Sequence, residues 1–102
     1  MSAIGNEDEM KKELIQKLTR ELPVLRARLG ASRADIAERI GISRQTYNNI
    51  ETKKREMNWT TFVALIAVFQ NNQETRRMLN AIDGFERELE DAISIQEQTE
   101  RM

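Results

Sequence analysis

The chain has 102 residues, 39% hydrophobic and 32% charged, which predicts one compact domain over residues 1–102. It contains neither cysteine nor histidine, which excludes disulfides and removes the commonest general base and metal ligand, so we expect no enzyme, no cofactor and no metal site. The formal net charge of −1 excludes a uniformly basic chain, so a nucleic-acid interface would require a local concentration of positive charge.

The N-terminal segment lacks the features of a targeting sequence. Met1 to Glu13 is polar and acidic, whereas a secretory signal is first basic and then apolar. No apolar run is long enough to span a membrane. We therefore expect a cytoplasmic protein without a membrane partner.

A long first helix is predicted by an apolar stripe. Strong helix formers dominate the chain, which has four glycines and one proline, so the fold class is all-α. Pro23 lies within the stripe, and the unbroken spacing favours one bent helix that ends near Gly30. Because proline removes a backbone hydrogen bond, a break near Glu21 is the alternative. The stripe consists of Leu14, Leu18, Leu22, Leu25 and Leu29.

Two short helices follow, over about residues 32–40 and 43–52. Ser32 and Ser43 are placed to accept hydrogen bonds from the first free amides of these helices. Gly41 is expected to end the first of them, since glycine readily adopts the left-handed conformation of a helix C-terminus. The result is a pair of short helices joined by a tight turn.

Three more amphipathic segments complete the chain. Asn58 is the expected N-cap of the fourth helix, and Asn71 or Asn72 that of the fifth. Asp83-Gly84 is expected to separate these from a C-terminal helix and tail over 84–102, with fraying from Gln96. The apolar stripes consist of Phe62, Leu65, Ile66 and Phe69, then Thr75, Met78, Leu79 and Ile82, then Phe85, Leu89, Ala92 and Ile93.

Positive charge is concentrated in one segment. Residues 26–55 hold eight basic and three acidic side chains, whereas residues 56–102 hold four basic and nine acidic ones. A charge run is ordinarily a solvated face. The basic segment indicates a binding surface only because it contains the pair of short helices.

The helix pair meets the requirements of a helix-turn-helix. Ala37 supplies the small residue where the two helices cross, and Gly41 supplies the turn. Apolar side chains close the inner faces of both helices. These are Ile36, Ile40, Ile42, Tyr47 and Ile50.

The stretch from Leu25 to Phe69 resembles the Cro and phage-repressor type of helix-turn-helix regulators, the XRE family. The likeness is carried by SRADIAERIGISRQTYNNIE at residues 32–51, with a capped helix, a Gly-hydrophobic-Ser turn and a second helix that ends in Ile-Glu. The resemblance implies a five-helix lambda-repressor-like DNA-binding domain, here with an N-terminally extended first helix and an additional C-terminal helix. It also implies a helix-turn-helix core over 25–69 and a bacterial transcriptional regulator, typically a repressor, that binds double-stranded operator DNA through its third helix.

The chain departs from the family pattern at two positions. The family usually has glutamine at the start of the second helix, where this chain has Arg33. It usually has glycine after the recognition helix, where this chain has Lys53. Both departures add positive charge near the expected DNA backbone.

The recognition helix, residues 43–52, presents a polar face before its last turn that contains no acid. Arginine pairs bidentately with guanine, and glutamine or asparagine with adenine, so Arg44, Gln45 and Asn49 are the predicted base contacts. The predicted phosphate contacts are Arg33, Ser43, Asn48, Lys53, Lys54 and Arg55.

The family pattern also assigns structural residues. It pairs Glu51 with an arginine of the first helix, which here falls on Arg26. Glu51 is therefore expected to be structural and not to face DNA, where it would repel phosphate. Ala37, Gly41 and Ile50 complete this structural group.

Other functions compete with DNA regulation. A protein-interaction module without DNA binding, and an antitoxin that binds both operator and toxin, are consistent with the acidic C-terminal third. Trp59 and Tyr47 resemble base-stacking residues, but their spacing favours the core. Acids such as Glu86 and Asp91 fit a solvated helix face better than a metal site.

A homodimer is expected, because one helix-turn-helix contacts only a few base pairs. The apolar strip after Gly84, formed by Phe85, Leu89, Ala92 and Ile93, is the predicted contact, provided that the preceding helices do not need it. Two alternatives are a lid on its own subunit and a contact through the region of the fourth and fifth helices, including Asn72 to Asn80.

Overall fold

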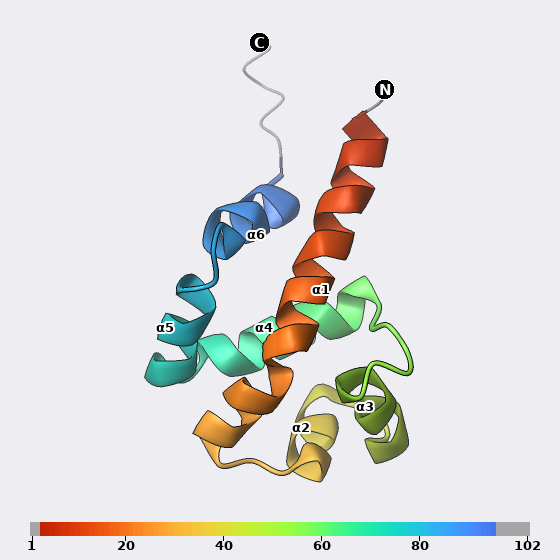
Figure 1. Ribbon diagram of the computed structural model, residues 1–102, viewed down its shortest axis with the longest axis vertical. Coiled ribbons are helices and arrows are strands. Elements are labelled where there is room, and N and C mark those ends of the chain that lie inside the picture. Colours follow the sequence, from red (N-terminus) through yellow and green to blue (C-terminus); the bar gives the residue numbers. More distant parts are fainter. Residues whose placement is uncertain (1–2, 96–102) are drawn as a thin grey trace.

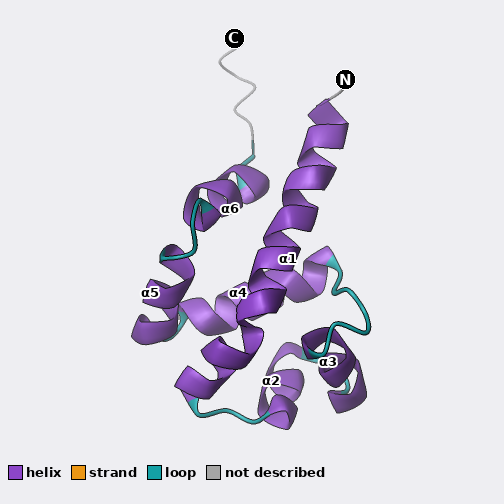
Figure 2. Cartoon of the chain, viewed as in Figure 1, coloured by secondary structure: helices purple, strands orange, loops and turns teal. Residues whose placement is uncertain are grey.

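The computed structural model describes residues 3–95, which form six helices and, within that range, no strand (Figure 2). The predicted all-α class is therefore confirmed. The tail from Gln96, predicted to fray, lies outside the described residues. The helices are α1 (Ala3–Leu29), α2 (Arg33–Ile40), α3 (Arg44–Glu51), α4 (Trp59–Gln70), α5 (Gln73–Asn80) and α6 (Phe85–Ile93).

The first helix is continuous through Pro23, as the unbroken leucine stripe predicted. The first four leucines of the stripe are buried, and Leu29 is partly buried against the same core. Burial of this apolar face offsets the backbone hydrogen bond that proline removes. The helix ends before Gly30, which has φ 70°.

Side-chain caps fix where the following helices begin. Ser32 Oγ accepts from the Asp35 amide and Asp35 Oδ2 from the Ser32 amide, each at 3.0 Å, so this pair forms a capping box. The hydrogen bond from the Ser32 backbone lowers the pKa of Asp35. The side chains of Ser43, Asn58 and Asn72 also accept hydrogen bonds from first-turn backbone amides and so cap α3, α4 and α5. All four predicted N-caps are confirmed.

The core forms where α4 crosses α1. Helix α1 runs along the length of the molecule, with α2 and α3 at one end and α6 beside its N-terminal half (Figure 1). Tyr47 and Ile50 of α3 are buried in the same core, which fixes how α3 is rotated about its axis. The stripe of α4 is fully buried: Phe62, Leu65, Ile66 and Phe69.

Helix α6 folds back onto its own subunit. Phe85 is 1% exposed and Leu89 8% exposed, and Lys17 of α1 donates to Glu88 at 2.9 Å and to the carbonyl of Asp83 at 3.1 Å. Phe85 and Leu89 are therefore not left over for a second copy, in agreement with the lid alternative, whereas Ile93 at the end of the strip remains 56% exposed. The extended N-terminal half of α1 supplies the surface that covers the buried part of the strip.

Within residues 3–95, no helix is both long enough and apolar enough to cross a membrane.

Candidate nucleic-acid interface

The turn between α2 and α3 is built on Gly41. Its φ of 83° lies in the left-handed region, and its amide donates to the carbonyl of Ala37 at 2.9 Å. The amide of Ile42 donates to the same carbonyl at 3.0 Å, which closes the turn. A side chain at position 41 would meet no atom within 4 Å, so backbone conformation alone requires glycine there.

The three predicted base-reading residues come together on the outward side of α3. Because Tyr47 and Ile50 point into the core, Arg44 and Gln45 are exposed, and Asn49 is half-buried beside them. Gln45 Nε2 donates to Asn49 Oδ1 at 3.4 Å, which links two of the three side chains. The resulting surface offers both donors and acceptors.

Periodicity predicts that Thr46, Asn48 and Asn49 are exposed, but all three are half-buried. Thr46 and Asn48 flank Tyr47 in sequence, and the packing of Tyr47 turns part of both side chains toward the protein. Asn48 Oδ1 is buried and has no hydrogen-bond partner among the described residues. A phosphate oxygen only accepts hydrogen bonds, so a phosphate contact by Asn48 would use Nδ2 as the donor and would leave Oδ1 in its buried position.

Ser43 is occupied at the N-terminus of α3. Its Oγ accepts from the Thr46 amide at 3.0 Å and donates to Thr46 Oγ1 at 2.9 Å. The hydroxyl is exposed but is already used as the cap of the helix. Its contribution to a phosphate contact would come mainly from the free backbone amides that it leaves at this helix end.

A buried carboxylate lies at the far end of α3. The Glu51 side chain is 2% exposed, and both of its oxygens accept from Arg26, from Nε at 3.0 Å and from Nη2 at 2.8 Å. Arg26 Nη1 also donates to the carbonyl of Ala31 at 3.2 Å. The structure thus brings the expected pair together and ties α1 to α3 and to the α1–α2 loop.

Arg33 joins the same carboxylate, which sequence reasoning missed. Its Nε lies 3.4 Å from Glu51 Oε2, while its side chain stays partly exposed at the start of α2. The sequence did carry a signal for this contact, because Arg33 stands where the family usually has glutamine. An arginine at that position can form an ion pair with Glu51, which a neutral glutamine cannot do. The predicted phosphate contact is therefore positioned by Glu51 before any DNA is bound.

The protonation of Glu51 reflects a competition. Burial by itself would raise the pKa of Glu51, but the hydrogen bonds from Arg26 and the charges of Arg26 and Arg33 hold it below the ordinary value. The hydrogen bond to Glu51 in turn raises the pKa of Arg26. The group is consequently ionised at neutral pH.

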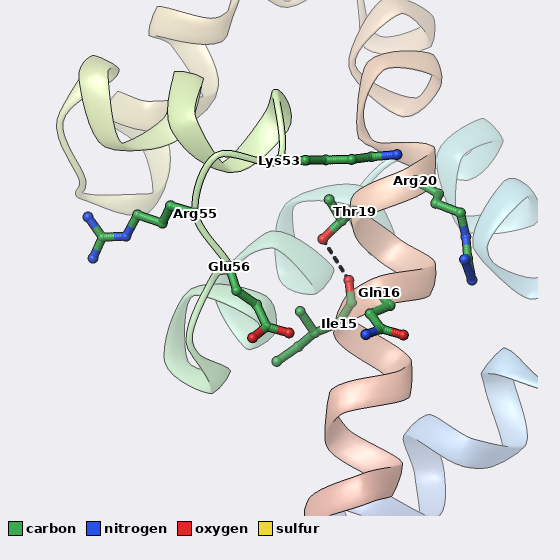
Figure 3. A pocket seen from close by; sticks show the side chains of 7 residues that line it. All are labelled: Ile15, Gln16, Thr19, Arg20, Lys53, Arg55 and Glu56. Carbon is green, nitrogen blue, oxygen red and sulfur yellow. Dashed lines mark hydrogen bonds between the residues drawn. The ribbon is translucent and has the colours of Figure 1, made fainter.

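The segment after α3 carries the remaining predicted phosphate contacts. Lys53 adopts φ 66°, the conformation for which the family's usual glycine is suited, and the amides of Lys54 and Arg55 donate to the carbonyl of Asn49 at 2.8 and 3.2 Å. All three basic side chains are exposed. They do not form one cluster, because Lys53 extends toward α1 whereas Arg55 points away from it (Figure 3).

Comparison with known proteins agrees with this geometry. Residues 17–79 match the model of the family described as helix-turn-helix domain, which covers more than half of the chain. Searches of curated proteins and of solved structures found no match. The chain therefore belongs to the helix-turn-helix domain family, a DNA-binding fold.

Proposed function

We propose that this protein is a sequence-specific transcriptional repressor of the Cro and phage-repressor type, not an enzyme, which inserts α3 into the major groove of operator DNA. The observation that carries the proposal is the face formed by Arg44, Gln45 and Asn49. It is polar, free of acids and held outward by two buried residues of the same helix. An anionic duplex favours such a face, and base edges can be read from it.

Each of the three residue types has a matching base edge. Arg44, at the N-terminal end of α3, can donate two hydrogen bonds to guanine O6 and N7. Gln45 and Asn49 can pair with adenine N6 and N7, and their mutual hydrogen bond at 3.4 Å limits the orientations that either amide adopts. Restricting these side chains before binding lowers the entropy lost on contact with DNA.

The predicted phosphate contacts lie at both ends of α3. Ser43 and Arg33 lie near the N-termini of α3 and α2, where free amides and a guanidinium favour an anion. Lys54 and Arg55 follow the C-terminal end of α3. A helix lying in the major groove has a sugar-phosphate strand on each side, so contacts on both sides would fix its register.

Selection of bound sites from random duplex DNA, followed by affinity measurements on the preferred site, tests the proposal. We expect Arg44→Ala, Gln45→Ala and Asn49→Ala each to cost about 1–3 kcal/mol on that site and much less on random DNA. Gln70→Ala, an exposed change on α4, is the matched control and should leave both affinities unchanged. Equal losses on both DNAs would show that these residues do not read bases.

We also propose that two copies bind two half-sites about 34–36 Å apart. Helix α6 lies away from the α2–α3 end of the molecule, whereas α4 lies close to it (Figure 1), so a contact through α4 would bring two recognition helices nearer to one another. Helix α4 contains no charged residue, and its outer face exposes Val63. Self-association through this face would oppose no like charges.

Sedimentation of full-length variants tests the dimer. We expect Val63→Glu to convert a dimer to monomers, because it would bring two like charges together across the two-fold axis. Val24→Glu, at another exposed valine on α1, is the control and should leave the dimer intact. A wild-type protein that stays monomeric both free and on DNA would contradict the proposal.

The acidic C-terminal segment favours a second candidate function, the docking of a protein partner such as a toxin or co-regulator. Residues 56–102 carry nine acids against four basic side chains. A neighbouring reading frame for a toxin-like protein would support an antitoxin. Absence of any salt-dependent shift on generic duplex DNA would instead favour an interaction module that does not bind DNA.

A further inference from the structure

A groove lies between α1 and the segment that follows α3 (Figure 3). Its volume is about 280 Å³, and its apolar floor is formed by Ile15, which is almost fully buried. The hydroxyl of Thr19 donates to the carbonyl of Ile15 at 2.7 Å, so this donor is already used within α1. The lining residues are Ile15, Gln16, Thr19, Arg20, Lys53, Arg55 and Glu56.

Two basic side chains from different elements line the groove, Arg20 of α1 and Lys53 of the segment after α3. The guanidinium of Arg20 extends along α1, away from the Lys53 ammonium (Figure 3). The ammonium group of Lys53 extends toward α1, where Arg20 and Thr19 lie (Figure 3). In residues 3–95, neither Arg20 nor Lys53 forms an ion pair. The only carboxylate of the lining, that of Glu56, points toward Ile15 instead. The groove is therefore lined by two basic side chains that have no ion-pair partner in the part of the chain that the structure describes.

The backbone of Lys53 indicates that its side chain matters. A residue with a Cβ at φ 66° is strained by contact between Cβ and the carbonyl oxygen, and glycine would relieve that strain. Residues held in such conformations cluster at binding sites, because something other than stability retains them. What lysine adds over glycine at this position is an ammonium group reaching across the groove.

We propose that Arg20 and Lys53 form a phosphate-binding site, and that its occupant is a phosphodiester of the bound DNA outside the contacts of α3. This inference rests on the proposed DNA binding and extends the DNA footprint from the helix-turn-helix onto α1. A phosphate bound in the groove would accept charge-assisted hydrogen bonds from Lys53 and, once the flexible Arg20 side chain turns toward the ammonium, from Arg20 as well. The exposed amide of Gln16, one turn before Arg20, supplies a further donor.

The salt dependence of binding to random duplex DNA tests the site. Each lost phosphate contact should reduce the slope of log affinity against log salt by about 1, so Arg20→Gln and Lys53→Gly should each flatten it by about that amount. Lys53→Gly is informative because removal of backbone strain should raise the thermal midpoint while DNA affinity falls. A variant that was merely unfolded would lose both. Arg87→Gln is the control, because it removes one positive charge from α6, outside the groove. It should flatten the salt slope less than Arg20→Gln or Lys53→Gly does.

Inorganic phosphate provides the second arm, which distinguishes a DNA backbone from a free phosphate group. Phosphate-dependent chemical-shift changes at Arg20 and Lys53 that disappear in Arg20→Gln would support the site even if the DNA slopes were unchanged, and its occupant would then be a free phosphate compound. If wild-type protein binds no duplex, the proposed function fails, while this titration still tests the groove. Unchanged DNA slopes together with no phosphate response at either residue would overturn the proposal.

Discussion

At the scale of single residues, Glu51 connects the stability of the protein to its proposed interface. It is the buried acid on which both Arg26 of α1 and Arg33 of α2 converge. Removing one partner of a buried ion pair leaves a desolvated charge, which costs more than the pair contributes while intact. The same carboxylate orients Arg33, which carries a predicted phosphate contact.

We predict that Arg26→Ala lowers the free energy of unfolding by about 3 kcal/mol, since it leaves Glu51 buried without its main partner. Urea unfolding of Arg26→Ala, of Glu51→Gln and of the double variant gives the interaction energy between the two residues. We expect this coupling to be about 1–3 kcal/mol. Arg28→Ala is the control, because its pair with Glu74 is exposed and should be worth less than about 1 kcal/mol. Additive effects of Arg26→Ala and Glu51→Gln would reject the pairing.

The lowered pKa of Glu51 predicts acid sensitivity. The unfolded chain takes up a proton near the ordinary pKa of 4.5, whereas the folded protein does so only at lower pH. The stabilisation is therefore complete above that value and is lost as pH falls from about 4.5 through the folded pKa. Urea unfolding between pH 6 and pH 3 should show a smaller loss of stability in Glu51→Gln than in wild type. Parallel curves would mean that Glu51 does not contribute to acid sensitivity.

At the scale of elements, the interface depends on the ends of two short helices. Helices α2 and α3 are too short to be stable alone, so caps and packing hold them. Gly41 and Lys53 are both in the left-handed region, one before α3 and one after it. Only the first is a glycine, so equivalent backbone conformations are relaxed at one end of α3 and strained at the other.

Opposite substitutions at these positions should have opposite effects. Gly41→Ala should lower the free energy of unfolding by about 1–2 kcal/mol through backbone strain alone, because a Cβ there meets no neighbour. Lys53→Gly should relieve strain and stabilise by up to about 1 kcal/mol, reduced by the added flexibility of the unfolded chain. Thermal and urea unfolding report both. Destabilisation in Lys53→Gly would show that the conformation of Lys53 costs little.

At the scale of the whole molecule, α6 completes the core. Phe85 lies 6.2 Å from Phe62, centroid to centroid, and Phe62 stacks on Trp59 at 4.7 Å. Lys11 of α1 lies 5.0 Å above the Trp59 ring. These contacts join α6, α4 and the N-terminal half of α1.

Removal of the buried part of this strip should therefore destabilise the protein. We predict that Phe85→Ala costs about 3–5 kcal/mol, because it opens a cavity beside Phe62. Ile93→Ala, at the 56%-exposed end of the same strip, should cost no more than about 0.5 kcal/mol. Fluorescence of Trp59 during unfolding reports on this region directly. Similar losses in both variants would contradict the packing of α6 on α1.

Sequence by itself determined the elements and most of their boundaries. Capping residues such as Ser32 and Asn58 act through hydrogen bonds two or three residues away, and the stripe through Pro23 is periodic along one helix, so local patterns were sufficient. The outward placement of Arg44 and Gln45 followed from the same periodicity. The resemblance supplied the pairing of Arg26 with Glu51, because residues separated so widely in the chain leave no periodic signal.

Tertiary structure alone decided how the elements cover one another. The strip after Gly84 is equally apolar whether it faces a second copy or its own α1, and only packing assigns Phe85 and Leu89 to the core. Packing of Tyr47 likewise turns Asn48 partly inward, and the path of Lys53 toward Arg20 depends on where α1 lies. These features depend on contacts between residues distant in sequence, whereas periodicity and capping report only on neighbours along the chain.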